Sequence, residues 1–447
     1  MNRHLLCTAA LLTLPFAASP ALACSVSALS VTCSGVSSGF EDDTDGLSIL
    51  VESGATVQDN GDTLKGEGNG VTITNDGTVI SDSKDAIDWG DIDNGTGTDL
   101  SITNNGKLTA AKDGINAADD FHIENFGTIE AGDDGIQAGN GKGSGTIGIL
   151  NGASGLIDTE DKAITVGDGV WLFNEGTIDS GNEAFEAGND ARVTNKGTIT
   201  AFEDGVQVGT GARIDNYGAI VSTGNDGDGI DIDDGTIINY AGASITVAGS
   251  AGIDYDAGGD SSVENYGLIE GVEGIMVETG LDAAGNPNGE VGNVAVQKIL
   301  NAGTIRGTGG TALLLGEGND VLELLDGAIV DGLSDLGDDD DSLIFSSLSY
   351  GTDGFDSLFD GGEGTDTVSF TFDISNLATA TLDAGILTLA FGDAVGLGDL
   401  DLTNFEVFDF AGTAYTINDL VPAVPLPAGA ILLGTALAGF GAVRRRR

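Results

Sequence analysis

The feature that most constrains the fold of this chain is an asparagine repeat that runs through its middle. The motif Asn-x-Gly-x-(Ile/Val/Leu) and two looser copies make ten repeats, whose asparagines lie 21 to 36 residues apart. The ten residues are Asn75, Asn104, Asn125, Asn151, Asn174, Asn195, Asn216, Asn239, Asn265 and Asn301. A period of this length is typical of a solenoid, in which each repeat forms one coil and packs on its neighbours.

Three apolar positions recur at similar places in every repeat. The first lies two residues before the asparagine: Ile73, Ile102, Ile123, Ile149, Leu172, Val193, Ile214, Ile237, Val263 and Ile299. The second follows it: Val79, Leu108, Ile129, Ile157, Ile178, Ile199, Ile220, Ile245, Ile269 and Ile305. The third comes last: Ile87, Ile115, Ile136, Ile164, Phe185, Val206, Ile230, Ile253, Ile275 and Leu313. Short β-branched patches between glycine-bearing turns predict three strands per coil, stacked from coil to coil.

The predicted fold is therefore all-β: a single-stranded parallel β-helix of about ten regular coils plus caps, with the repeats at residues 47–330. Neighbouring coils are expected to lie ~4.8 Å apart. The recurrent asparagine is expected to adopt a left-handed backbone at a tight turn and to hydrogen-bond from coil to coil. The repeat resembles bacterial surface β-helix proteins, including autotransporter passengers and filamentous adhesins. That resemblance implies a structural, adhesive or matrix role.

The N-terminal segment has the pattern of an export signal. Residues 1–23 contain an apolar run and end in the small-x-small sequence Ala21-Leu22-Ala23, which is typical of signal-peptide cleavage. Cys24 and Cys33 are then the cysteines left in the mature chain, and in an oxidising compartment they predict a disulfide. A lipid anchor on Cys24 is the alternative, but such sites prefer Leu at the place of Ala21. Residues 24–46 are expected to cap the N-terminal end of the solenoid.

The C-terminal segment, residues 422–447, contains a motif, an apolar stretch and a basic tail. The motif is Val424, Pro425, Leu426, Pro427 and Ala428, and the tail is Arg444, Arg445, Arg446 and Arg447. This order resembles the VPLPA-type sorting signal that exosortases read in Gram-negative bacteria. The resemblance implies export across the inner membrane, anchorage through a C-terminal transmembrane helix, processing by an exosortase-type enzyme, and surface or extracellular release. A simple tail anchor is the alternative.

Charge limits the classes of partner and of chemistry. The chain has 71 acidic and 16 basic residues and a net charge of -55, so a nucleic-acid partner is excluded because it would be repelled. His122 is the one histidine beyond the signal peptide, which leaves few general bases near neutral pH. Arg192 and Arg213 look like repeat positions instead of a singular site. We therefore expect no enzyme and no required cofactor; the alternative is a carbohydrate-active lyase or hydrolase, or a carbohydrate-binding β-helix protein.

A calcium motif is suggested in the acidic region that follows the repeats, residues 331–421, and just before it. The segments 316–322 and 361–368, which contain Asp320 and Asp366, resemble the RTX calcium nonapeptide. Between them, the segment 337–343, which contains Asp341, lacks the second glycine. Carboxylate and turn carbonyl oxygens suit Ca²⁺. Because these aspartates are 21 and 25 residues apart instead of nine, ordinary Gly-Asp turns are the alternative to calcium binding.

Two further columns have more than one interpretation. The column of Asp113, Asp134, Asp204 and Asp228 is expected to consist of solvated turn residues, with a cation site as the alternative. The tyrosines that directly follow the asparagine in three consecutive coils are Tyr217, Tyr240 and Tyr266. These tyrosines either pack on one another across coils or form a stripe that stacks on the sugar rings of an extracellular polysaccharide.

Overall fold

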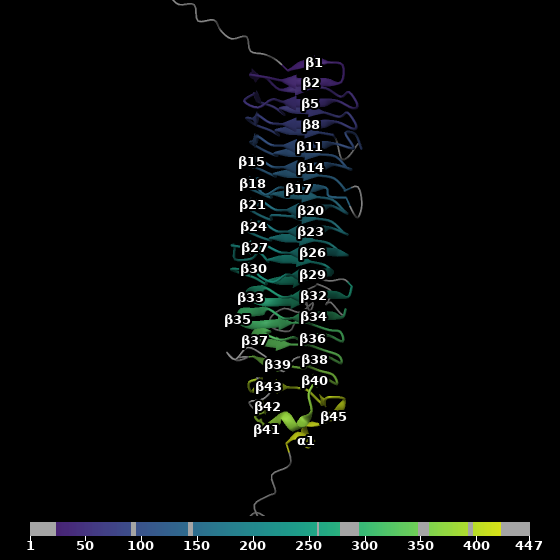
Figure 1. Cartoon of the computed structure of the whole chain (residues 1–447), viewed down its shortest axis with the longest axis vertical. Helices are drawn as coiled ribbons and strands as arrows, with labels where there is room; N and C mark the ends of the chain where they lie inside the picture. The colour runs from purple at the N-terminus through teal and green to yellow at the C-terminus, as the bar shows by residue number, and fades with distance from the viewer. Residues whose placement is uncertain are drawn as a thin grey trace, which may run out of the picture.

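The molecule is a rod of stacked coils, with the N-terminal strands at one end and the C-terminal strands at the other (Figure 1). The computed structural model describes residues 24–90, 95–141, 146–256, 259–277, 295–346, 357–391 and 397–421. Their strands form one 18-stranded and one 27-stranded sheet, paired mainly in parallel. The predicted all-β parallel β-helix is confirmed. No helix in the described part of the chain has both the length and the apolar character that a membrane span needs.

Each regular coil has three short strands, which we assign to a first, a second and a third face. The first face carries the asparagines and consists of β2 (Ser30–Cys33), β5 (Ser48–Val51), β8 (Thr72–Asn75), β11 (Ser101–Asn104), β14 (His122–Asn125), β17 (Ile149–Asn151), β20 (Trp171–Asn174), β23 (Arg192–Asn195), β26 (Ala212–Asn216), β29 (Gly235–Asn239), β32 (Ser261–Asn265), β34 (Gln297–Asn301), β36 (Val321–Leu324), β38 (Ser342–Phe345), β40 (Thr367–Phe370) and β44 (Val407–Phe410).

The second and third faces belong to the larger sheet. The second consists of β3 (Val36–Ser37), β6 (Thr56–Asp59), β9 (Thr78–Ser81), β12 (Lys107–Ala110), β15 (Thr128–Ala131), β18 (Leu156–Thr159), β21 (Thr177–Ser180), β24 (Thr198–Ala201), β27 (Ala219–Ser222) and β30 (Ser244–Val247). The third consists of β4 (Phe40–Glu41), β7 (Leu64–Gly66), β10 (Ile87–Trp89), β13 (Ile115–Ala117), β16 (Ile136–Ala138), β19 (Ile164–Val166), β22 (Glu186–Ala187), β25 (Val206–Val208), β28 (Ile230–Ile232), β31 (Ile253–Tyr255), β39 (Leu358–Asp360) and β43 (Leu400–Thr403). Three longer strands connect the two faces: β33 (Leu268–Val277), β35 (Thr304–Leu314) and β37 (Ile329–Asp335).

The core is the space that the three faces enclose. All thirty predicted inward residues are at most 3% exposed, and equivalent residues pair in parallel register, as Ile102 does with Ile73 and Ile123. Strand residues alternate between buried and partly exposed, because successive side chains point to opposite faces of a sheet. The three predicted apolar columns are thus confirmed.

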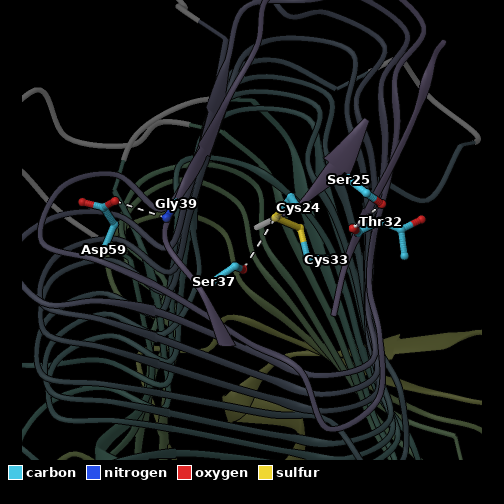
Figure 2. The surroundings of a disulfide bond; sticks show 7 residues. All are labelled: Cys24, Ser25, Thr32, Cys33, Ser37, Gly39 and Asp59. Carbon is cyan, nitrogen blue, oxygen red and sulfur yellow. Dashed lines mark hydrogen bonds between the residues drawn. A yellow bond between two sulfur atoms is a disulfide. The ribbon is translucent and has the colours of Figure 1, made fainter. Parts of the chain in front are cut away.

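Both ends of the stack carry antiparallel strands. At the N-terminal end, β1 (Ser25–Ser27) lies antiparallel on β2, and a disulfide joins Cys24 to Cys33 just below it (Figure 2). Cys33 is fully buried and occupies the position that the asparagine takes in the regular coils, two coils before Asn75. The C-terminal elements are β41 (Leu377–Asp383), β42 (Ile386–Phe391), β45 (Thr413–Tyr415), the 3₁₀ turn η1 (Ile374–Asn376) and α1 (Ile417–Leu420). The antiparallel strands terminate the parallel stack at both of its ends. This arrangement limits edge-to-edge association with other molecules.

Candidate functional site

The asparagine repeat forms one continuous hydrogen-bonded ladder inside the rod. All ten side chains have no solvent exposure. The Nδ2 of each of the first nine donates to the Oδ1 of the asparagine in the next coil at 2.8 to 2.9 Å, and that of Asn301 donates to the carbonyl of Ile329 at 3.0 Å. The same Nδ2 of Asn104 also donates to the carbonyl of Thr128 at 3.2 Å. Backbone amides of the following turn supply further donors, as Gly77 does to Asn75 at 3.1 Å. The predicted coil-to-coil bonding is therefore present.

The backbone explanation for these asparagines was wrong. None of the ten has a positive φ; each ends an extended strand of the first face. The backbone of the glycine two residues later is also not left-handed. At this position the backbone of the preceding coil lies too close to leave room for a side chain. A Cβ on Gly106 would collide with the carbonyl oxygen of Gly77, and one on Gly127 with that of Gly106. Glycine is required at this corner because the backbones of successive coils approach each other there.

A second ladder, which the repeat analysis missed, lies where the third face returns to the first. The Oδ1 of Asp119 accepts from the backbone amide of Asn140 at 2.7 Å, and the Oδ1 of Asn140 accepts from that of Asp168 at 2.9 Å. Asp168 in turn accepts from the amide of Asn189 at 2.7 Å. The sequence signal was present as recurring Gly-Asn and Gly-Asp pairs, such as Gly139-Asn140.

The aspartate column at the corner between the second and third faces is only partly solvated, because Asp134 is buried and Asp113, Asp204 and Asp228 are half-buried. Asp134 is 7% exposed, and its backbone amide donates to the Oδ1 of Asp113 at 3.2 Å. Asp228 donates to Asp204 in the same way at 2.7 Å. Burial and the neighbouring charge of Asp85 raise the pKa of Asp113 to about 7, and burial raises the pKa of Asp134 to about 6. These carboxylates accept hydrogen bonds from the backbone of the next coil and so hold the two coils together, although burying a carboxylate costs solvation free energy.

The three aspartates of the calcium prediction are brought together in consecutive coils. Asp320, Asp341 and Asp366 are at most 1% exposed. The Oδ1 of Asp341 accepts from the backbone amide of Asp320 at 2.7 Å, and the Oδ1 of Asp366 accepts from that of Asp341 at 2.8 Å. The Oδ1 of Asp320 accepts from Gln297 at 2.7 Å.

The second carboxylate oxygen of each of these three aspartates is buried and has no hydrogen-bond partner. Burial raises the pKa of Asp320 and of Asp341 to about 8 and that of Asp366 to about 6. A buried carboxylate oxygen without a partner is costly, and either a proton or a bound cation relieves that cost. Oxygen donors of this kind fit a hard cation such as Ca²⁺.

One of the other acidic clusters already has cationic partners. Asp62, Asp85 and Asp88 lie close enough together to hold a metal, but Lys65 bonds to Asp62 and Asp88 at 2.8 and 2.7 Å. Although burial opposes it, hydrogen bonds from Lys65 and Lys84 lower the pKa of Asp62. The lysines thus take the place that a metal ion would fill.

The predicted tyrosines lie at the corner between the first and second faces. The rings of Tyr217 and Tyr240 stack with centroids 3.9 Å apart and planes 10° apart, so cross-coil packing is present for this pair. The hydroxyl of Tyr266 donates to Glu264 at 3.0 Å. Tyr217 is 45% exposed and Tyr266 is 37% exposed, which leaves both accessible to a ligand.

The remaining predictions concern the chain ends and the single histidine. The signal peptide and the residues of the sorting motif and arginine tail lie outside the described residues. His122 is on the first face, where its Nδ1 lies 2.9 Å from the carbonyl of Ile147 and its Nε2 lies 3.4 Å from Glu124. Comparisons with family models, with curated proteins and with solved structures found no match.

Proposed function

We propose that this chain is an exported, highly acidic β-helix rod with a structural or adhesive role at the surface of a Gram-negative bacterium or in its extracellular matrix. The observation that carries the proposal is the continuous asparagine ladder from Asn75 to Asn301. Such a ladder makes every coil depend on the next, which suits a long, stiff spacer. The net charge of -55 favours a soluble rod that does not associate with other acidic surfaces.

The proposed route to the surface depends on both chain ends. The signal peptide would direct export, and the motif at 424–428 with the arginine tail at 444–447 would hold the protein in the membrane for an exosortase-type enzyme. Deleting the four arginines, or replacing Pro425 and Pro427 by Ala, should leave the protein unprocessed in the membrane fraction. Circular dichroism of the retained protein should still show a folded β-structure. Unchanged release of both variants into the medium would contradict the sorting proposal.

We also propose that the rod binds calcium beside its C-terminal coils. Neighbouring members of this column, Asp320 with Asp341 or Asp341 with Asp366, would hold an ion through the carboxylate oxygens that lack hydrogen-bond partners. Bound calcium would neutralise charge inside the stack and so stabilise it, without any role in catalysis. The three Oδ1 atoms would keep their bonds to the backbone of the preceding coil.

A further inference from the structure

The regular coils bury their aromatic side chains except along one side of the rod. Trp89, Phe121, Phe185 and Tyr255 are at most 1% exposed. By contrast, the aromatic residues that reach solvent on the first face, or at the corner after it, are Phe126, Trp171, Phe173, Tyr217, Tyr240 and Tyr266. Among the described residues of these coils, Phe202 is the one that reaches solvent elsewhere, at 53% exposure. Aromatic surface left in water on one side of a molecule is typical of a binding site.

Six residues on neighbouring strands and in the turns that follow them form the centre of this surface, which we call the aromatic band: Trp171, Phe173, Arg192, Arg213, Tyr217 and Tyr240. Trp171 pairs in register with Arg192, and Arg192 with Arg213, so these three form an outward column across β20, β23 and β26. Phe173 lies two residues after Trp171 on the same outward side. The stacked tyrosines close the band at the corner.

Two polar groups of the aromatic band, those of Arg213 and Tyr240, contact the same carboxylate. The guanidinium of Arg213 donates to both carboxylate oxygens of Asp215, at 2.9 and 2.7 Å. The hydroxyl of Tyr240 lies 3.5 Å from the same carboxylate. Arg192 makes no ion pair with a described residue, and with Arg213 it lines a groove that Asn140, Asp168 and Asp190 also line. The band therefore offers oriented donors and acceptors next to apolar rings.

The charge of this region differs from that of the rod as a whole. Lys196 lies 3.6 Å from Glu175 and 4.5 Å from the centre of the Phe173 ring. The cations Arg192, Lys196 and Arg213 stand against the carboxylates of Asp168, Glu175, Asp190 and Asp215, and Glu264 also acts on Arg213. Because three of the chain's 16 basic residues gather here, the region is less acidic than the chain as a whole, which favours a ligand that is itself uncharged. A polyanion would be repelled by the rest of the rod, and a polycation would prefer its more acidic faces.

We propose that the aromatic band binds an uncharged polysaccharide that lies along the rod. The apolar C–H surface of each sugar would contact the aromatic rings, while its hydroxyls would bond to the guanidinium, carboxylate and tyrosine groups. Because outward positions repeat every ~4.8 Å from coil to coil and the band extends over several coils, the surface suits a polymer better than a single sugar. This proposal goes beyond the adhesive role by naming the ligand class and the face that binds it, and it depends on neither sorting nor calcium.

Fluorescence of the purified full chain tests this proposal. The chain has two tryptophans, and Trp89 is fully buried, so a change in emission on adding ligand reports on Trp171. The probes are dextran, neutral arabinoxylan and hydroxyethyl cellulose, with alginate and polygalacturonate as acidic controls. At least one uncharged polymer should give a saturable change that neither acidic polymer gives. No response to any uncharged polymer, or an equal response to the acidic ones, would overturn the proposal.

Substitutions then place the binding on the band. Phe173→Ala and Tyr217→Ala should each weaken binding by about 3- to 10-fold. Phe202→Ala removes an exposed aromatic ring from a different corner and should leave the affinity unchanged. Melting temperatures of all three variants show whether they fold. Equal affinity of the folded band variants and the parent, or an equal loss in Phe202→Ala, would refute the assignment of this face. Neither result would affect the sorting proposal, which is tested separately.

Discussion

The side-chain amide of Asn104 donates a hydrogen bond to the Oδ1 of Asn125 in the next coil, 2.8 Å away. The Oδ1 of Asn104 accepts the same kind of bond from Asn75, also at 2.8 Å. An amide side chain can both give and accept such a bond, which a carboxylate or an ammonium group cannot do. This property allows asparagine to occupy the same position in every coil of a stack, with each side chain bonded to the next.

The ladder predicts a contrast between two adjacent asparagines. Asn104→Ala removes a fully buried side chain and leaves the Nδ2 of Asn75 and the carbonyl of Thr128 with one partner fewer. The free energy of unfolding in urea should fall by about 2–4 kcal/mol. Asn105 is exposed and its side-chain amide bonds to Asp76 on the surface. Asn105→Ala should therefore change the free energy of unfolding by no more than about 0.5 kcal/mol. Similar losses in both variants would argue against a stabilising role of the ladder.

The strand phase predicts a second contrast, on the second face. Ile199 has no exposure and pairs with Ile178 and Ile220, so Ile199→Asp places an unpaired charge in an apolar column. We expect a loss of at least about 4 kcal/mol or failure to fold. Thr198 is partly exposed, and Thr198→Asp should keep a melting temperature close to that of the parent. A stable Ile199→Asp protein beside an unstable Thr198→Asp protein would reverse the assigned phase.

The buried aspartates predict that the rod is more stable in mild acid. The pKa of Asp113 in the folded protein is about 7, above the ~3.9 of an unfolded chain. Folding therefore favours its protonated form, and the stability that this supplies is complete below about pH 4 and is lost as the pH rises through about 7. The same sign holds for Asp228, whose pKa burial raises to about 6. Melting temperatures between pH 4.5 and 8 should fall with rising pH.

Asp113→Asn tests the origin of that pH dependence. The amide oxygen can still accept from the backbone of Asp134, as the Oδ1 of Asp113 does at 3.2 Å, but the residue carries no charge. At pH 8 the variant should be more stable than the parent by on the order of 1–2 kcal/mol, after allowance for solvent screening. The difference should shrink as the pH approaches 4. A variant that is less stable than the parent at pH 8 would contradict this account.

Calcium should stabilise the rod beyond the effect of ionic strength. A site occupied in the folded state alone contributes about 2.7 kcal/mol at a hundredfold excess over the dissociation constant. Millimolar calcium should therefore raise the melting temperature more than sodium at matched ionic strength. The excess should disappear when Asp320 and Asp366 are both replaced by Asn, but persist in Asp326→Asn, where the aspartate is exposed. If calcium and sodium gave the parent the same melting curve, these three aspartates would have only a structural role.

The columns were predictable because their signal is local and repeated. A residue such as Ile102 is apolar, stands two places before an asparagine, and has an equivalent in each of nine other repeats. The alternation of side chains along a strand then determines which residues face inward. The same reasoning found the pairing of Asn104 with Asn125, since equivalent residues of successive coils must lie side by side.

The candidate site residues were harder to interpret, because their environment depends on the corners of the coil. The repeat placed Asp320, Asp341 and Asp366 in one column, but it could not show that each side chain turns inward and loses water. It likewise gave no reason to group Trp171, at the start of β20, with Tyr217, which follows the end of β26 and has a different position within the repeat.

The sequence by itself determined the number of strands in each regular coil, their phase and the stacking partners of the residues in the three apolar columns, because a repeated pattern encodes all three. The tertiary structure alone decided the backbone conformation at the asparagines, the burial of the aspartates and the composition of the aromatic band. These depend on how far the chain turns at each corner and on which backbone amides of the next coil come within reach. Side-chain bonds to backbone depend on geometry, and residue identity does not specify that geometry.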